Sequence, residues 1–167
     1  MRMTILLTLG LMLLFVLLIL TACVFLPSAS LLSFWPEDIQ ERLKPRVAGA
    51  AMTPKRIAGI VLFLLIGAGM AGIFVLGGID GIRNHFTYGQ FLLRFLVIGV
   101  SIKAFDIIGF DWFLMTKTHF FQHFFPETEG CAGWQQFGYN RRQQIRQCIL
   151  ILVSAPVTAA VFWLIGG

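Results

Sequence analysis

Long apolar runs alternate with shorter polar segments along this chain. Four of the runs approach or exceed the roughly 20 residues that a helix needs to cross the hydrocarbon core of a bilayer. They cover residues 3–26, 57–78, 91–115 and 148–165. The pattern predicts an all-α fold, an integral membrane four-helix bundle, in which residues 1–167 form a single transmembrane domain.

The first run has a second interpretation. The segment Leu20-Thr21-Ala22-Cys23 has the small residues that precede a lipidated cysteine, and signal peptides also begin with a basic residue such as Arg2. However, this apolar segment is longer than the core of a signal peptide, and it continues past the cysteine to Leu26. We therefore expect a retained transmembrane helix.

Composition strengthens the membrane interpretation. Hydrophobic residues make up 57% of the chain and charged residues 13%, whereas a soluble domain has roughly 45–50% and about 25%. The net charge of +5 comes from basic residues clustered between the apolar runs, which argues against nucleic-acid binding. The 3 cysteines are widely spaced and indicate no disulfide framework.

The distribution of lysine and arginine predicts the orientation, because basic loops stay on the cytoplasmic side. Residues 27–56 carry five of them and residues 116–147 carry four, but residues 79–90 carry only Arg83. We therefore expect both long loops in the cytoplasm and both termini outside it, in the inner (plasma) membrane of a bacterium.

The first long loop contains a candidate short amphipathic helix over residues 35–43. Pro36 suits the first helical turn, and Pro45 is expected to end the helix. Ile39 and Leu43 would share one face, so this cytoplasmic helix could lie flat on the membrane surface. An ordinary capped loop helix fits the same residues.

Small residues in the second run indicate where helices approach each other. Gly67 and Ala71, and likewise Ala68 and Gly72, have the four-residue spacing of close helix contacts. After this run, Asp80-Gly81 is typical of a turn in a short outer loop.

The third run differs from the others because it contains Arg94, Lys103, Asp106 and Asp111. Arg94 can extend toward the outer interface. Lys103 and Asp106 fall near the middle, where each charge costs about 2.5–3.5 kcal/mol and needs a partner. Three residues apart, they would share a helix face and neutralise each other. A functional pair and a structural ion pair are both open.

A second polar group is expected at the cytoplasmic end of this run. Asp111 and Trp112 end it, and Glu129 follows in a turn over residues 126–130. The carboxylates need donors there, and the neighbouring candidates are Lys117, Arg141, Arg142 and Arg146. The expected cluster either ties the loop to the bundle or forms a binding site.

His119 and His123 are spaced to lie on one face of a helix, where they could hold a transition metal with carboxylates. Membrane metal enzymes with histidine ligands need more histidines than the 3 in this chain. We therefore expect no metal and no other cofactor.

The segment from Asp106 to Tyr139 carries a recognisable pattern. Asp106 and Asp111-Trp112 are followed by Pro126-x-Thr128-Glu129-Gly130, by Gly133 and by Gly138-Tyr139. This pattern resembles that of a group of small bacterial multi-pass membrane proteins of uncharacterised function, and it covers about a fifth of the chain. The resemblance implies that these residues form a site or a signature, but it implies no reaction.

Three functions remain open. The polar site on the third helix and the following loop could bind or move a small ion or a lipid headgroup. Alternatively, the chain is a non-catalytic accessory or oligomer-forming subunit of a membrane complex, or a lipid-modifying enzyme at the cytoplasmic face. The absence of a nucleophile elbow, a P-loop and an H-E-x-x-H motif disfavours the enzyme. Expected partners are membrane lipids and a homo-oligomer or a larger membrane complex. The candidate site residues are Lys103, Asp106, Asp111, Trp112, Lys117, Glu129, Arg141 and Arg142.

Overall fold

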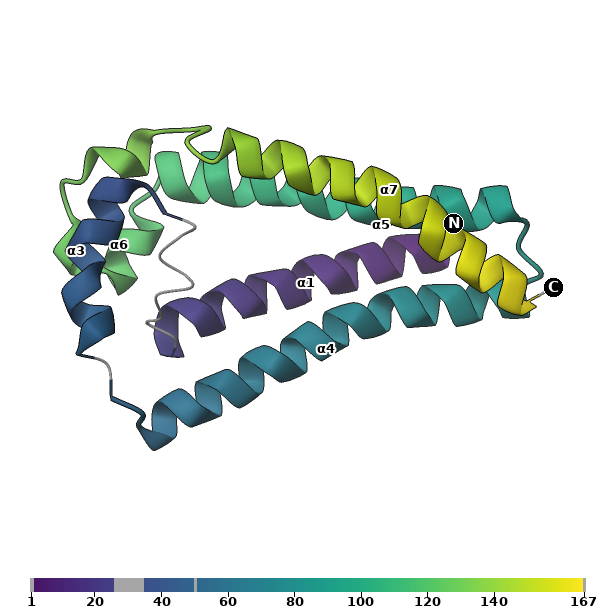
Figure 1. Ribbon diagram of the computed structural model, residues 1–167, viewed down its shortest axis with the longest axis horizontal. Helices are drawn as coiled ribbons and strands as arrows, with labels where there is room; N and C mark the ends of the chain where they lie inside the picture. The colour runs from purple at the N-terminus through teal and green to yellow at the C-terminus, as the bar shows by residue number, and fades with distance from the viewer. Residues whose placement is uncertain (1, 26–34, 50, 167) are drawn as a thin grey trace. The chain divides into compact units, whose positions relative to one another are not determined.

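The computed structural model describes residues 2–25, 35–49 and 51–166 (Figure 1). Within these ranges the chain forms helices and no strand, which confirms the all-α class. Among the described residues, three helices are long and apolar enough to cross a membrane, namely α1 (Arg2–Phe25), α4 (Pro54–Arg83) and α7 (Arg141–Gly166). The expected third run instead consists of α5 (Tyr88–Phe105) and a π-helix, η1 (Asp106–Leu114).

Two helices are longer than the apolar runs that predicted them. Helix α4 continues to Arg83, so the turn expected at Asp80-Gly81 is wrong and both residues are helical. Helix α7 begins at Arg141, seven residues before the apolar run. Apolar runs mark the part of a helix that suits lipid, whereas hydrogen bonding continues the helix into polar sequence.

The contacts of the chain divide it into two compact units. Unit 1 comprises Met1–Phe15, Gly67–Phe105 and Arg141–Gly167, and unit 2 comprises Val16–Ile66 and Asp106–Asn140. Each unit is described by itself.

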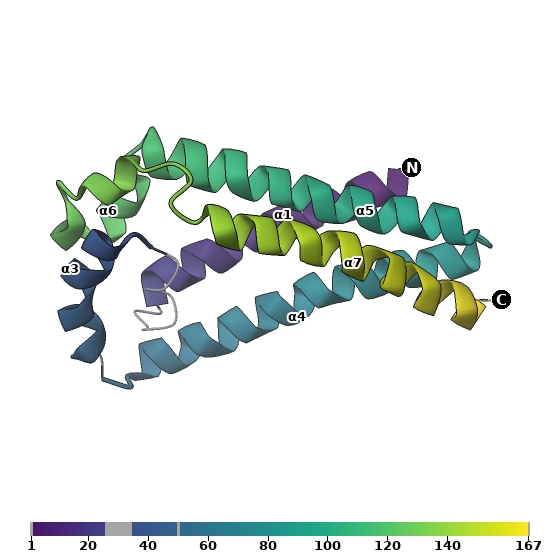
Figure 2. The same ribbon diagram turned by 45° about the horizontal axis from the view of Figure 1, so that its top comes forward.

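In unit 1, α5 and α7 run side by side (Figures 1 and 2). Phe91 and Phe95 of α5 pack with Ala155 and Ala159 of α7, and all four side chains are buried. Alternating large and small side chains let the two helices approach closely. The core also contains a stack of phenylalanine rings in which Phe162 lies 6.4 Å from Phe91 and 5.8 Å from Phe95, measured between ring centroids.

Two of these phenylalanine rings pack directly against glycines of α4. A Cβ atom added to Gly78 would meet the ring of Phe162 at 2.1 Å, and one added to Gly81 would meet Phe91 at 2.2 Å. No described atom lies within 4 Å of the corresponding position at Gly67 or Gly72. In unit 1 these close contacts of α4 therefore lie beyond the small-residue segment singled out in the sequence, in which Gly69 makes an ordinary contact with Leu14 at 3.5 Å.

Unit 2 is organised around α3 (Glu37–Ala48), which packs on two 3-10 turns, η2 (Pro126–Thr128) and η3 (Ala132–Gln135). The short helix forms as expected, but it continues through Pro45, so the expected end is wrong. Ile39 and Leu43 are 0% and 2% exposed. Protein therefore covers the apolar face, which rules out the arrangement in which this face lies on lipid.

Polar and aromatic contacts fasten the loop of unit 2. The Asp38 carboxylate accepts a hydrogen bond from the Gly133 amide at 2.8 Å. The Trp134 indole donates to both the carbonyl and the hydroxyl oxygen of Thr128, which is completely buried. Trp134 also stacks on Phe121 of α6 (Phe120–Phe124) with ring centroids 5.6 Å apart. The loop after η1 is thus a packed structure.

Candidate functional site: two carboxylates on a π-helix

The π-helix changes which side chains share a face. Residues five apart lie about 140° apart around an α-helix, because each residue turns the helix by about 100°. The π-helix has a wider turn, closed by hydrogen bonds between residues five apart. Asp106 and Asp111 are five apart within η1, so the wider turn brings them closer to the same side of the helix. An α-helix would have pointed them in different directions.

Two residues that precede α7 meet these carboxylates. The Asn140 side-chain amide donates a hydrogen bond to Oδ2 of Asp111 at 3.1 Å. The pKa of Tyr139 is raised above its ordinary value by burial, then by the negative charge of Asp111 and then by that of Asp106. Both carboxylates therefore act on one phenol, and the four side chains form the carboxylate–tyrosine site: Asp106, Asp111, Tyr139 and Asn140.

A left-handed turn at Gly138 sets the position of Tyr139. Gly138 has a φ of +83°, in the left-handed region that favours glycine. The Tyr139 amide bonds back to the Gln136 carbonyl at 3.4 Å, which closes the turn. Helix α7 begins immediately after Asn140. Any residue with a side chain at position 138 would strain the turn that presents Tyr139.

Lys103 lies in unit 1, where it is 8% exposed. Its ammonium group donates a hydrogen bond to Oε1 of Gln147 on α7. This bond links α5 to α7 and gives the buried lysine a polar partner. The neutralisation of Lys103 by Asp106 stays a prediction.

The remaining candidates divide between exposed and paired positions. Trp112, which is 45% exposed, and Lys117 lie on the surface of unit 2. Glu129 is also exposed, and in the described part of unit 2 it makes no ion pair. The acidic residue of this loop that does so is Glu127, whose carboxylate lies 2.9 Å from the Arg46 guanidinium. Arg141 and Arg142 are exposed in the first turn of α7.

The two histidines do not form the expected helical pair. His119 precedes α6 and only His123 lies within it, and both side chains are exposed. Among the described residues, no group of three or more histidine, cysteine or acidic side chains is arranged to hold a metal ion.

Arg94 contradicts its expected position. Its side chain is 2% exposed and lies 2.8 Å from Asp80, so it does not extend to the interface. It also donates to the Gly77 carbonyl at 2.6 Å and to the Thr4 hydroxyl at 3.2 Å, and it lies over the Phe86 ring. Extending α4 through Asp80 brings the acidic partner to the arginine.

Sequence reasoning missed Asn140 and gave Tyr139 no role in the site, although Gly138-Tyr139 belongs to the pattern described above. It placed Asp106 and Asp111 with α-helical geometry, which separates them. The sequence feature that could have indicated the site is the five-residue spacing of Asp106 and Asp111 in an apolar run. No known protein family, curated protein or solved structure matches the chain.

Two carboxylates and one half-buried phenol supply the oxygens of this site. Such a site attracts positively charged groups, and carboxylate, phenol and amide oxygens are ligands for hard cations. The oxygens also accept hydrogen bonds from an ammonium group. The arrangement therefore favours binding of a positive charge over binding of a phosphate.

Proposed function

We propose that the chain is a multi-pass membrane protein whose carboxylate–tyrosine site binds a positively charged ligand. The ligand is a small cation or the ammonium group of a zwitterionic lipid, which share the same chemistry at the site. The observation that carries the proposal is the π-helix, because it aligns Asp106 with Asp111 beside Tyr139. π-helical turns occur frequently at functional sites.

An energetic argument supports a cationic ligand. Maintaining the π-helix in place of α-helical hydrogen bonding is unfavourable, so it persists where the surrounding structure or a ligand compensates it. A cation bound beside Asp106 and Asp111 would favour the charged form of both carboxylates. Ligand binding would therefore stabilise the same backbone geometry that creates the site.

Four basic residues flank the site in the sequence and support a location at the cytoplasmic interface. Lys117 follows η1, and three arginines open α7 and are exposed: Arg141, Arg142 and Arg146. Exposed basic residues next to an apolar helix attract anionic headgroups and favour the cytoplasmic side. We propose that the protein resides in the inner membrane with these residues in the cytoplasm and both termini outside.

Tyr139 provides a direct reporter for ligand binding. The chain has 2 tyrosines, so a Tyr88→Phe background leaves Tyr139 as the only titrating phenol. The purified protein would be titrated to alkaline pH with phenolate absorbance as the readout. The probes would be sodium, magnesium, calcium or tetramethylammonium at constant ionic strength set with N-methylglucamine chloride. We expect at least one probe to lower the pKa of Tyr139, because a nearby cation stabilises the phenolate.

Substitutions decide whether the carboxylates cause this effect. Asp106→Asn and Asp111→Asn should each lower the pKa of Tyr139 without added probe and weaken the response to the cation. Glu37→Gln, an exposed carboxylate of α3, is the matched control and should change neither. A tetramethylammonium response would favour the lipid headgroup, and a metal-ion response the small cation. If no probe moves the titration, the proposed binding is wrong.

The orientation has its own test. Single cysteines at Lys55 and Arg142 should resist an impermeant thiol reagent added outside intact cells, and a cysteine at Arg83 should react. The background for this experiment lacks the native cysteines. Labelling of the first two positions from outside would reverse the proposed topology.

A further inference from the structure

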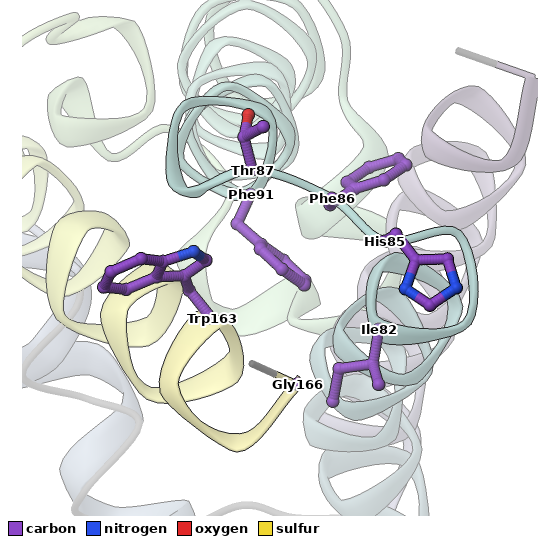
Figure 3. A pocket seen from close by; sticks show the side chains of 7 residues that line it. All are labelled: Ile82, His85, Phe86, Thr87, Phe91, Trp163 and Gly166. Atoms are coloured by element: carbon purple, nitrogen blue, oxygen red, sulfur yellow. The ribbon is translucent and has the colours of Figure 1, made fainter.

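Unit 1 contains a pocket of about 260 Å³ between the end of α4, the start of α5 and the end of α7. Figure 3 shows Trp163 and His85 on either side of it, with Phe91 between them. Phe91 is 1% exposed and belongs to the core, so it forms a fixed floor. Phe86 and Ile82 complete the apolar wall.

His85 occupies an unusual backbone position at this pocket. Its φ is +51°, and among the described residues it is the only non-glycine residue with positive φ. The Phe86 amide bonds to the Gly81 carbonyl at 2.9 Å, and the His85 amide bonds to the Ile82 carbonyl at 3.0 Å. These two bonds define the turn that usually ends a helix with glycine at the left-handed position. A histidine there is strained, and such strain concentrates at binding sites.

Phe86 is held rigidly on its protein side. The Arg94 guanidinium lies 4.3 Å from the centroid of its ring, and the same arginine is fixed by Asp80 and by the Gly77 carbonyl. The Phe86 ring also lies 5.6 Å from that of Phe91, measured between centroids. The apolar wall is therefore preformed, so a ligand would not have to order it.

The surroundings indicate the kind of ligand. Tyr88 and Trp163 lie edge to face at 6.2 Å, and both are partly exposed, as in the aromatic belt at a membrane interface. The volume lies below the roughly 300–1,000 Å³ of pockets for drug-sized ligands. Among the described residues no carboxylate lines the pocket, and the exposed Arg83 adds positive charge to this end of α4.

We propose that this pocket binds a fatty acid, with its apolar chain against Phe86, Phe91 and Trp163 and its carboxylate beside His85. The apolar wall accounts for the chain, and the interface position accounts for a molecule that has one polar end. The imidazole supplies a hydrogen-bond donor to the head, which explains why a strained histidine stands where glycine would be relaxed. This site is independent of the carboxylate–tyrosine site.

Trp163 allows the binding to be measured directly. A fatty acid brominated along its chain, which quenches tryptophan on contact, would be titrated into the purified full-length protein in lipid nanodiscs. The difference between the wild type and Trp163→Phe isolates the signal of Trp163 from the other tryptophans. We expect saturable quenching, whereas a fatty acid that only dissolves in the surrounding lipid quenches linearly.

His85→Gly separates binding from stability. It should raise the thermal midpoint of unfolding, because glycine relieves the left-handed strain. It should also weaken fatty-acid binding roughly fivefold, the effect of losing one hydrogen bond of ordinary strength. His85→Asn tolerates the same backbone and keeps a donor, so it should bind more tightly than His85→Gly.

A brominated alkane without the carboxylate provides the last control and should bind equally to the wild type and to His85→Gly. Linear quenching of Trp163 by the fatty acid would overturn the pocket as a binding site. Equal fatty-acid affinity in the wild type and His85→Gly would overturn the role of His85. The first result compares only the wild type with Trp163→Phe, so it does not depend on how the His85 variants fold.

Discussion

Each unit of this protein contains a group of charged residues, and the two groups differ in how their charges are paired. In unit 1, Arg94 is buried against the carboxylate of Asp80, 2.8 Å away, so opposite charges meet. In unit 2, Asp106 and Asp111 lie on one π-helix. Burial raises the pKa of Tyr139, and the negative charges of Asp111 and Asp106 raise it further. The first arrangement pairs opposite charges, and the second places two like charges on one short helix.

The difference separates a structural role from the binding role that we propose. An ion pair with further hydrogen bonds leaves little for a ligand to gain, and removing one partner is costly. Two carboxylates on one helix are instead the kind of group that a positively charged ligand binds. Arg94 and Asp111 are 17 positions apart in one apolar run, and only their neighbours distinguish these roles.

The largest expected effect comes from breaking the ion pair of unit 1. Arg94→Met leaves Asp80, which is 26% exposed, without its guanidinium. We expect the free energy of unfolding to fall by about 2–3 kcal/mol, less than for a pair in which both charges are fully buried. Adding Asp80→Leu should recover much of this loss, because no isolated charge then remains. Denaturant unfolding in detergent micelles measures both values.

Arg83→Met is the control, since Arg83 is an exposed arginine of α4, the helix that carries Asp80. It should change stability by less than about 0.5 kcal/mol. Equal losses for Arg83→Met and Arg94→Met would contradict the assigned role of the pair.

A smaller effect is expected from displacing the loop of unit 2. In Gly133→Ala the new Cβ would meet Oδ1 of Asp38 at 2.2 Å, so α3 and η3 must move apart. Overpacking of this kind costs about 1–3 kcal/mol. Cys131 lies next to this contact, with its sulfur 3.9 Å from the Asp38 carbonyl, and its rate of thiol labelling should rise.

The labelling would use a Cys148→Ser background, because Cys148 is exposed. Gly89→Ala is the matched control, since no described atom lies within 4 Å of its Cβ position. An unchanged labelling rate in Gly133→Ala would show that the contact between α3 and the loop does not protect Cys131.

The smallest effect concerns the dependence of stability on pH. The folded chain holds Tyr139 protonated above its ordinary pKa, so above about pH 10 only the unfolded chain ionises this phenol. Stability should therefore fall as pH rises beyond that point, and Tyr139→Phe should show a shallower fall. Below the ordinary tyrosine pKa both states keep the proton, and no difference in slope is expected. Parallel alkaline unfolding curves would show that Tyr139 is not held protonated.

These comparisons also show where sequence reasoning was sufficient. Long apolar runs predicted α1, α4 and α7 because a run of that length without charge suits a membrane-crossing helix wherever it occurs. The period of Ile39 and Leu43 likewise predicted the apolar face of α3. These features depend on residues within a few helical turns of each other, and such residues can be read directly from the sequence.

Only the tertiary structure determined what the charged residues do. Asp80 was expected in a turn because Asp-Gly is typical of turns, and no local rule connects it to Arg94 on another helix. Asp106 and Asp111 lie on a π-helix, whereas the sequence signals of helices are read with α-helical spacing. Tyr139 reaches them through a left-handed turn at Gly138 that depends on the packed loop. Charge interactions act through space, so the residues that give each charge its role are set by the fold and not by sequence distance.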